Sequence, residues 1–388
     1  MTSLTEWYRG RRVLITGHTG FKGAWLTAWL RDAGAALTGY ALPPERPSLF
    51  ELAGLAEGMT SVRADVREGA RLRDAVLAAE PEVVLHLAAQ SLVRRSYHYP
   101  VETFDTNVMG TVHLLEAIRS APSVRAVVVV TSDKCYEDLG SATAYREADP
   151  MGGHDPYSAS KGCAELATAA YRRSFFSAGP IAVASARAGN AIGGGDFAED
   201  RLIPDLMRAA ARGEIATLRS PEAVRPWQHV LEPIRAYLML GRALAEQGQA
   251  VAGAWNFGPA ERDMVTVREV ASRLEARWPE IRITASPAPS ETHEAHQLRL
   301  DAGKAAAVLG WRPILSLDDG ISLTVEWYRA ARTSPAAAAA TLFSQVRGYR
   351  GAGLAAASGR GTGRRHPVTS SSTNPFRYPV SGIVMISG

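Results

Sequence analysis

Five polar side chains between residues 132 and 161 could together remove and deliver protons on a small molecule. They supply a hydroxyl, a carboxyl, two amines and a phenol, and belong to Ser132, Asp133, Lys134, Tyr157 and Lys161. The first three follow a run of valines, the composition of a strand buried on both faces, so we expect them at the carboxyl edge of a sheet. Tyr157 and Lys161 are four residues apart, which places both on one face of a helix. We interpret the cluster as an active site.

The triplet Ser132-Asp133-Lys134 also has a purely structural interpretation. Ser and Asp often cap the turn that follows a strand, and the triplet alone does not distinguish such a turn from a catalytic site. Its proximity in the expected fold to Tyr157 and Lys161 favours catalysis.

Six strand-like segments, each followed by a helix-like one, form the framework that must position these side chains. The strands are expected at residues 11–16, 37–42, 61–66, 83–89, 126–131 and 181–187. This alternation predicts an α/β fold with a doubly wound, Rossmann-type parallel sheet over residues 1–189. Loops and shorter segments beyond residue 190 indicate a smaller mixed α/β, substrate-binding domain at 190–334. The Ala run and the Gly, Ser, Arg and Thr of residues 335–388 show no sustained period, so we expect disorder there.

A glycine-rich turn joins the first strand to the first apolar helix. Its spacing, Gly17, Gly20 and Gly23, is looser than the GxGxxG of many dinucleotide sites, but it stands between a strand and a helix, as such a site requires. Gly17 would allow the tight turn, Gly20 the approach of a pyrophosphate, and Gly23 close packing of helix on strand. The alternative is an ordinary turn. We favour dinucleotide binding by Gly17, Thr19, Gly20, Phe21, Lys22 and Gly23.

Further cofactor contacts are expected at the ends of the next strands. Small residues would let a cofactor pass, and the candidates are Asp65, Val66, Leu87, Ala88, Ala89 and Asn107, with Tyr157 and Lys161 on the nicotinamide side. Asp65 lies either near the adenine or at a helix N-cap. The second strand has no acid at its end to hold a ribose 2′-hydroxyl, and Arg46 nearby could favour a 2′-phosphate, so the residues leave NAD and NADP open. His86, within an apolar run, is interpreted as a core histidine.

Substrate contacts are expected from a polar loop and from the second domain. The loop contains Gln90, Ser91 and Arg94, and the second domain contributes Asn190, Arg201, Arg225, Trp227 and His229. A guanidinium beside an indole can hold a phosphate and line a base or a sugar. Each of the three arginines could instead lie on the surface.

The composition excludes several classes of protein. The formal net charge is +4, but residues 348–388 carry five Arg and no acidic residue, so the basic character belongs to that segment and predicts no nucleic-acid surface on the folded part. Cys135 and Cys163 fit no metal-ligand spacing and are expected to be reduced thiols of a cytoplasmic protein. No secretory signal and no apolar stretch long enough to span a membrane is evident.

The residues quoted above resemble those of the extended short-chain dehydrogenase/reductases, in the order Gly17-x-x-Gly20-x-x-Gly23, then 87–90 (Leu-Ala-Ala-Gln), then Tyr157-x-x-x-Lys161. Within that family the chain is similar to the CDP-glucose 4,6-dehydratases. The segments that carry this closer similarity are 17–23, 132–136, 149–157, 225–230 and 293–296, and the resemblance covers about residues 5–330.

The resemblance implies an NAD-dependent lyase that converts CDP-D-glucose to CDP-4-dehydro-6-deoxy-D-glucose and water. In that reaction Tyr157, aided by the charge of Lys161, takes the proton of the sugar 4-hydroxyl during oxidation at C4. We assign removal of the C5 proton to Lys134 and protonation of the departing 6-hydroxyl to Asp133, where many related enzymes have Thr-Asp-Glu for this triplet. The resemblance also implies a homodimer, or a dimer of dimers, through helices 101–119 and 157–176, and a role in making dideoxy sugars of a cell-surface polysaccharide such as O-antigen.

Two other functions compete with this one. Another nucleotide-sugar 4,6-dehydratase or a 4-epimerase could use the same scaffold, although an epimerase has no need of the acid and base at Asp133 and Lys134. A non-catalytic dinucleotide-binding regulator would need neither the Tyr/Lys pair nor a phosphate-binding second domain.

Overall fold

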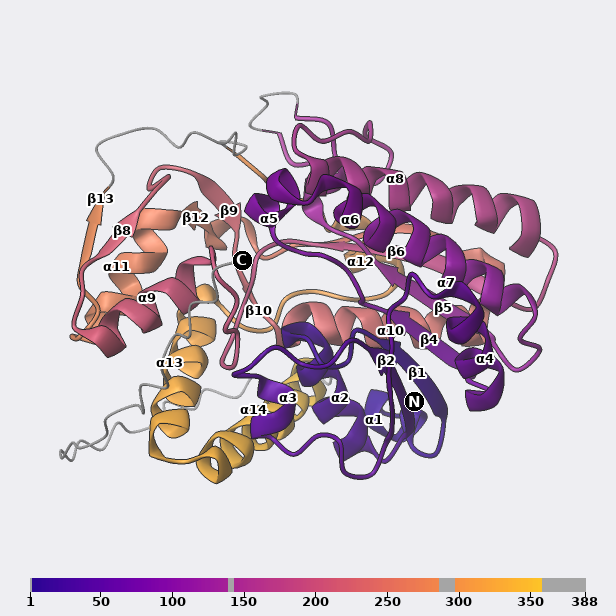
Figure 1. The fold of residues 1–388 in the computed structure, drawn as a ribbon, viewed down its shortest axis with the longest axis horizontal. Helices are drawn as coiled ribbons and strands as arrows, with labels where there is room; N and C mark the ends of the chain where they lie inside the picture. Colours follow the sequence, from indigo (N-terminus) through magenta and orange to yellow (C-terminus); the bar gives the residue numbers. More distant parts are fainter. Residues whose placement is uncertain (1, 139–142, 286–296, 358–388) are drawn as a thin grey trace, which may run out of the picture.

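The computed structural model describes residues 2–138, 143–285 and 297–357. A seven-stranded parallel sheet with the order β3-β2-β1-β4-β5-β6-β11 forms its centre (Figure 1). The strands are β1 (Arg12–Thr16), β2 (Ala36–Ala41), β3 (Thr60–Arg63), β4 (Val83–His86), β5 (Ala126–Val130), β6 (Ala182–Ala188) and β11 (Gly253–Phe257). The prediction of a doubly wound, Rossmann-type sheet is confirmed.

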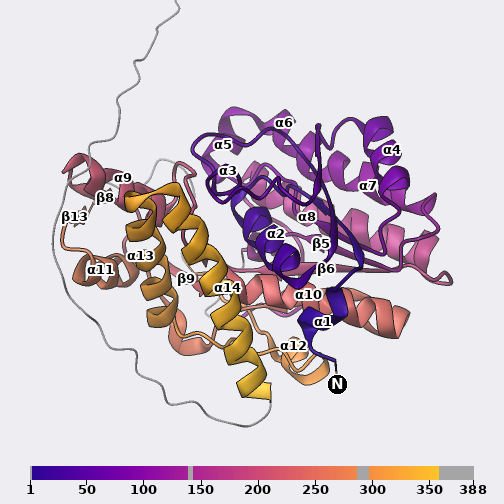
Figure 2. The same ribbon diagram turned by 90° about the horizontal axis from the view of Figure 1, so that it is seen from below.

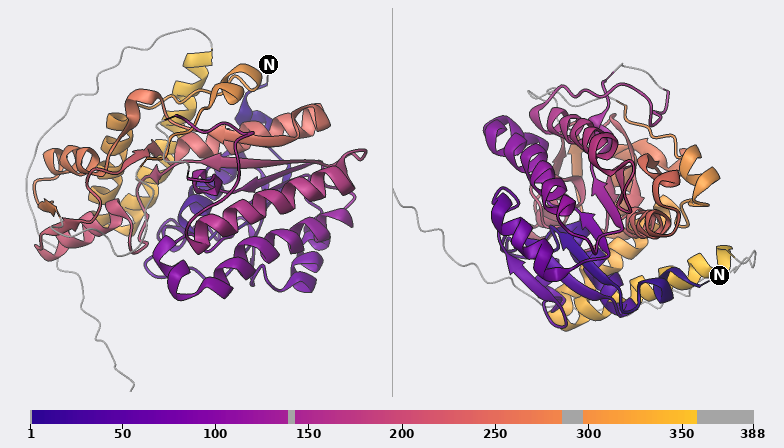
Figure 3. Two further views of the ribbon diagram at one scale, coloured as in Figure 1. Left: turned by 90° about the horizontal axis from the view of Figure 1, so that it is seen from above. Right: turned by 90° about the vertical axis from the view of Figure 1, so that its right-hand side faces the viewer.

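Alternate residues of these strands enter two hydrophobic cores, one on each face of the sheet. In β5, Val128 faces one core while Val127 and Val129 face the other. The first core packs against α1 (Leu4–Tyr8), α2 (Phe21–Ala33) and α10 (Leu231–Gln247). The second face is covered by α4 (Gly69–Ala79), α7 (Gly110–Arg119) and α8 (Pro156–Tyr171), which lie together in Figure 3. Burial on both faces explains why the strands read as continuous apolar runs.

The remaining helices of this half are short. They are α3 (Leu49–Leu52), α5 (Val93–His98) and α6 (Pro100–Phe104), with a 3-10 turn at Asp133–Cys135 and π-helical turns at Asp105–Met109 and Arg172–Phe176. The helix expected at 101–119 is therefore interrupted by a π-helical turn, and Asn107 lies in that turn. Interruptions of this kind are common at functional sites.

The second part of the chain carries small sheets and helices beside the carboxyl edge of the main sheet. Its strands are β7 (Ala191–Ile192), β8 (Ala216–Leu218), β9 (Val224–Pro226), β10 (Gln228–His229), β12 (Met264–Thr266) and β13 (Ile283–Ala285). Its helices are α9 (Leu202–Arg212), α11 (Val267–Arg277), α12 (Gly303–Val308) and α13 (Leu317–Thr333), with 3-10 turns at Gly248–Val251 and Glu261–Asp263.

The boundary predicted at residue 189 requires correction. After β10 the chain returns to the first half, where α10 covers β4, β5 and β6, and β11 pairs with β6 at the end of the sheet. Residues 231–257 thus belong to the central sheet and its covering layer, although they fall inside the expected second domain. The physical reason is that β6 would otherwise be an exposed edge, and β11 covers it.

The expectation of disorder from residue 335 is also wrong for its first part. Residues Pro335–Ala357 form the helix α14, which lies beside α13 and α2 (Figure 2). Its Ala338, Leu342, Val346 and Tyr349 are buried, and Arg347 pairs with Asp32 of α2 at 2.8 Å. Residues 358–388 lie outside the described residues.

Three buried histidines make the stability of the fold pH-dependent. Burial lowers the pKa of His18 to about 4 and those of His86 and His229 to about 3. His86 bonds to Thr16 and Thr111, which confirms its interpretation as a core histidine. Since the unfolded chain binds protons near pH 6.5 and the folded chain does not, stability is full above that pH and falls as pH drops toward 4, by up to about 1.4 kcal/mol per histidine and pH unit.

Urea denaturation at several pH values tests this prediction. We expect the unfolding midpoint to fall steadily between pH 6.5 and 5. Above pH 7 the buried Lys22 and Lys161, whose pKa values are lowered to about 8, should make the midpoint rise further with pH, so the histidines are tested below pH 7. His98→Gln, which changes an exposed histidine, should leave that pH dependence intact. A midpoint independent of pH between 7 and 5 would contradict the prediction.

Candidate active site

The catalytic candidates meet at the carboxyl end of β5, as predicted. Ser132 leaves the strand and accepts a hydrogen bond from the Lys134 amide at 3.2 Å, which begins the 3-10 turn. Asp155 caps α8 by accepting from the Ser158 amide at 2.9 Å, and Tyr157 follows in the first turn of that helix. Tyr157 is hydrogen-bonded to Ser132, and Lys161, one turn on, donates to the Val130 carbonyl at 3.4 Å.

The electrostatics of the triplet suit acid chemistry at Asp133. Its side chain is 3% exposed; one carboxyl oxygen accepts from Ser132 at 3.0 Å and the other has no hydrogen-bond partner among the described residues. Burial raises the pKa of Asp133, against the opposing influence of Lys134. A buried carboxyl with a raised pKa can carry a proton near neutral pH.

The environment of Tyr157 includes Ser132 and Arg201 in addition to the predicted Lys161. Burial raises the pKa of Tyr157 to about 12, and its hydrogen bond to Ser132 and the charge of Arg201 are what oppose this rise. Burial and the charge of Lys22 lower the pKa of Lys161 to about 8. The guanidinium of Arg201 is therefore a cation, beside the predicted Lys161, that can stabilise a phenolate at Tyr157.

Lys22 joins the glycine turn to the catalytic cluster. It is the second residue of α2, and burial, followed by the charge of Arg201, lowers its pKa to about 8, while Asp133 acts in the opposite direction. Its charge also acts on Lys161. The glycine turn and the Tyr/Lys pair therefore face one common site.

The glycine turn fits a dinucleotide pyrophosphate. Gly17 has φ = +74°, and a Cβ there would lie 2.7 Å from the Ala88 amide nitrogen; a Cβ on Gly23 would lie 2.0 Å from the Gly17 carbonyl oxygen. At Gly20, by contrast, a Cβ would meet only the Gly17 oxygen at an ordinary 3.5 Å, so the packing of the chain leaves space beside this residue. No side chain caps the N-terminus of α2 at Gly20, and its first turn carries no acid. A helix start of this kind attracts phosphate.

Several other predicted cofactor residues line or support this site. Ala88 donates to Thr16 at 3.2 Å, Leu87 and Ala89 are partly exposed beside it, and Thr19 donates to the Leu42 carbonyl at 3.0 Å. Phe21 is partly buried, and Val66 packs at Gly110. Asp65 is not the N-cap of α4, because Glu68 occupies that position. The carboxylate of Asp65 instead binds Arg67. Arg46 pairs with Glu51 at 3.1 Å.

Asn107 and Gln90 link the loop after β4 to the helices α6 and α8 by hydrogen bonds. Asn107 accepts from the Gln90 amide at 2.9 Å and donates to the Gln90 carbonyl and to Ser160 of α8. The side-chain amide of Gln90 is occupied by Leu92 and Thr103. The Gln90 side chain therefore fixes the loop after β4 to α6 and does not have the free amide that the predicted substrate contact requires.

The predicted arginines come from both parts of the chain, Arg94 from the first and Arg201 and Arg225 from the second. Arg201 pairs with Asp196 at 2.9 Å and donates to Ser91 at 2.9 Å, and Arg94 lies 3.7 Å from Asp200. Arg225 is buried in β9 and is close enough to lower the pKa of Asp133. The predicted contacts of these three arginines with a substrate stay a prediction. Asn190 is partly exposed, and its carbonyl accepts from the Gln228 amide at 3.0 Å.

Trp227 and His229 lie elsewhere than predicted. The Trp227 amide donates to the Arg225 carbonyl, so the chain turns between β9 and β10 and strand alternation is lost. The indole is 5% exposed and donates to Val265 at 3.1 Å, and the His229 ring packs edge-on against Trp25 in the main core. Both residues support the site from the core instead of facing it.

Sequence reasoning missed the buried ion pair of Glu165 and Arg187, which are 2.8 Å apart. Glu165 lies one turn after Lys161 on the same face of α8, and Arg187 stands in an apolar strand. The sequence contained a signal for this pair, because Glu165 and Arg187 each stand among apolar residues of a segment expected to be buried. Buried charges are usually paired, so the two could have been predicted to meet.

Comparison with known proteins places the chain in a family. Residues 14–324 match the model of the GDP-mannose 4,6 dehydratase family, and the chain belongs to it. The CDP-glucose 4,6-dehydratase of Salmonella typhimurium is 46% identical over 331 residues, which cover 84% of this chain and 92% of that protein. A dTDP-glucose 4,6-dehydratase of Xanthomonas campestris is 30% identical, over 82% of this chain and 93% of its own length.

Solved structures share the fold. A dTDP-glucose 4,6-dehydratase of Streptomyces venezuelae with NAD bound superposes with a TM-score of 0.70 at 27% identity, covering 83% of this chain and 98% of its own. A UDP-glucose 4-epimerase of Thermotoga maritima superposes with a TM-score of 0.72 at 22% identity, covering 82% of this chain and 99% of its own. At this identity the similarity shows the fold alone. Within the described residues, no helix is long and apolar enough to cross a membrane, and no group of His, Cys, Asp and Glu could hold a metal ion.

Proposed function

We propose that the chain is a CDP-glucose 4,6-dehydratase, a hydro-lyase that uses NAD and forms CDP-4-dehydro-6-deoxy-D-glucose and water. The observation that carries the proposal is the turn Ser132-Asp133-Lys134 facing Tyr157 and Lys161. The 46% identity to a CDP-glucose 4,6-dehydratase over most of both chains supports the nucleotide, since the dTDP-glucose enzymes are more distant.

The residues have separate tasks in this reaction. Bound NAD supplies the acceptor for the C4 hydride and later the donor to C6. Tyr157 takes the proton of the 4-hydroxyl, with Ser132 and Arg201 stabilising the phenolate. The C4 ketone acidifies the C5 proton, which Lys134 removes, while Asp133 protonates the 6-hydroxyl so that the C6–O bond breaks and water leaves. A proton returned to C5 and the hydride at C6 complete the 6-deoxy sugar, and NAD is unchanged overall.

Three arginines are the proposed partners of the substrate pyrophosphate. Arg94, Arg201 and Arg225 come from α5, from the loop before α9 and from β9, and all reach the same edge of the sheet. Guanidinium groups bind phosphate oxygens in pairs, so pyrophosphate binding is proposed to involve Arg94 of the first part together with Arg201 and Arg225 of the second part.

Incubation with CDP-glucose and, separately, dTDP-, UDP- and GDP-glucose tests the proposal. We expect a 4-keto product, detected by its absorbance in alkali, from CDP-glucose without net NADH. A C4 epimer without keto product would overturn it in favour of an epimerase, for which Asp133 and Lys134 have no use. A non-catalytic regulator is disfavoured because Lys22 of the glycine turn and Lys161 share one site.

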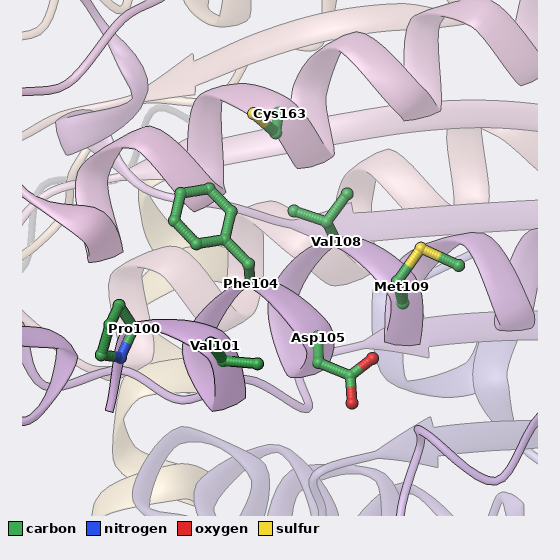
Figure 4. Close-up of a pocket in the computed structure, with 7 residues that line it drawn as sticks. All are labelled: Pro100, Val101, Phe104, Asp105, Val108, Met109 and Cys163. Carbon is green, nitrogen blue, oxygen red and sulfur yellow. The ribbon is translucent and has the colours of Figure 1, made fainter. Parts of the chain in front are cut away.

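An apolar surface over α6, α8 and the π-helical turn between α6 and α7 supports a homodimer. A groove there is lined by Pro100, Val101, Phe104, Val108, Met109 and Cys163, together with the single charged residue Asp105 (Figure 4). Val101 is 82% exposed and Phe104 37%, and Leu166 on α8 is 59% exposed, which is unfavourable for a surface in contact with water. A second copy of this face, joined as a dimer or as a dimer of dimers, would cover it.

Light scattering on Val101→Glu tests the dimer. We expect a dimer for the unmodified chain and a monomer for the variant, because a carboxylate would be buried without a partner. Ile215→Glu, at an exposed apolar residue of the second part, is the matched control and should stay dimeric. A dimer that survives Val101→Glu would remove this face as the interface.

A cytoplasmic location and a role in supplying dideoxy sugars for a surface polysaccharide such as O-antigen complete the proposal. Free Cys135 and Cys163 and the use of NAD and an activated sugar support them.

A further inference from the structure

The segment that carries Asp133 and Lys134 is held at its start by Glu165. Thr131, directly before the triplet, donates to Glu165 at 2.5 Å, and the second carboxylate oxygen accepts from Ser185 at 2.6 Å and from Arg187 at 2.8 Å. Glu165 and Arg187 are each 4% exposed. Burial raises the pKa of Glu165, but Arg187, Ser185 and Thr131 overcome it and hold that pKa below its usual range.

The same ion pair holds the segment at its end. Arg187 donates to the hydroxyl of Tyr136 at 2.7 Å, and its guanidinium lies 4.9 Å from the centre of the Tyr136 ring. Tyr136 follows the 3-10 turn directly, so Arg187 and Glu165 together join residues 131 and 136 around the triplet.

Tyr136 also ties the segment to β11 and to the loop before α8. Its hydroxyl donates to Asn256 at 2.7 Å, and Asn256 donates to the Tyr145 carbonyl at 2.9 Å. The rings of Tyr136 and Tyr145 are stacked 4.8 Å apart and nearly parallel. Every polar group of this network that touches Tyr136 is buried, so an alternative position of the turn would leave several of them unpaired.

We propose that Glu165, Arg187 and Tyr136 are positioning residues for the elimination of water. None of them touches the reacting atoms. They fix both ends of a six-residue segment whose acid and base must reach C6 and C5 of the sugar, whereas Tyr157 is carried by α8 and meets that segment only through its hydrogen bond to Ser132. Because elimination depends on the positions of two side chains of the segment, and oxidation on this one hydrogen bond, disturbing the network should impair elimination more than oxidation at C4. The predicted effects on the rates of elimination and oxidation rest on the proposed function.

Tyr136→Phe is the sharpest test, since it keeps the stacked ring and removes only the hydroxyl. We expect elimination to slow roughly ten- to a hundredfold, because misplacement of a catalytic group has effects of that size. Oxidation at C4 should be little changed, so absorbance at 340 nm should accumulate in the presence of CDP-glucose. Thr131→Val, which breaks the other end, should act in the same direction.

Hydrogen exchange gives a readout independent of turnover. We expect amides of residues 131–138 to exchange faster in Tyr136→Phe than in the unmodified protein. Tyr8→Phe is the matched control: it removes an equally buried hydroxyl, bonded to Leu238 at 2.9 Å, and should leave this segment and the ratio of the two steps unchanged.

The outcomes separate the two proposals. If the unmodified chain makes no keto sugar, the proposed function fails, and the exchange data still test the network. If Tyr136→Phe leaves exchange at 131–138 unchanged, or lowers oxidation and elimination equally, the positioning role is overturned.

Discussion

Replacing Tyr157 with Phe is expected to lower the rate of keto-sugar formation about a thousandfold, the usual scale for losing a positioned acid–base group. The ring and its place in α8 are kept, and only the hydroxyl bonded to Ser132 is lost. No other phenol was predicted at the site, and oxidation at C4 is the first step, so its loss stops the steps that follow. Initial rates with CDP-glucose measure the effect.

The nearby buried tyrosine of α10 provides a matched control. Tyr237 is fully buried and lies close enough to Tyr157 for the charge of Tyr157 to raise the pKa of Tyr237. Its hydroxyl has no hydrogen-bond partner among the described residues. Tyr237→Phe should retain the activity of the unmodified chain. NAD affinity, measured by titration, should change little in Tyr157→Phe; a variant that lost only NAD binding, or kept more than about a tenth of the rate, would refute the assignment.

Four of the six predicted strands, β1, β4, β5 and β6, were predictable because they are buried on both faces. Their apolar runs stand out from the polar segments around them, whereas the residues of β3, at the edge of the sheet, are exposed or only partly buried. The seventh, β11, was missed as a sheet member because a parallel partner is set by long-range packing, which a five-residue segment does not encode. In α14 the buried residues 338, 342, 346 and 349 have helical spacing, a signal obscured by the surrounding alanines.

The site was predictable where residue type and chain position agreed. Ser132, Asp133 and Tyr157 were placed from a strand end and a helical spacing, and the fold brings them together. Trp227 was misplaced because a tight turn centred on Pro226 reverses the face of the strand, and the available signal was this proline, a residue common in turns. The effect of Arg201 on the pKa of Tyr157 was not predicted, because the approach of Arg201 to Tyr157 depends on how distant segments of the chain pack.

Replacing Asp133 with Asn is expected to slow elimination at least about a hundredfold while oxidation at C4 continues. The amide keeps the size of the side chain and an acceptor for Ser132, but it has no proton to give to the 6-hydroxyl. Because the carboxyl is buried and its pKa is raised, the unmodified residue is suited to that donation. Rapid mixing with CDP-glucose should show absorbance at 340 nm that persists, with little keto product.

Two further variants decide whether this effect belongs to Asp133 itself. Asp263→Asn changes another buried carboxylate, which accepts from the Leu317 amide at 3.1 Å far along the chain, and should form keto sugar without persistent absorbance at 340 nm. Lys134→Ala should reproduce the Asp133→Asn pattern, because removal of the C5 proton and departure of the 6-hydroxyl belong to one elimination. If Lys134→Ala only weakened substrate binding and eliminated normally, the base would be another group, whereas Asp133 would keep its role as the acid. If Asp133→Asn eliminated at the unmodified rate, the turn after β5 would bind the sugar without catalysing water loss, and the distinction from an epimerase would have to come from elsewhere in the site.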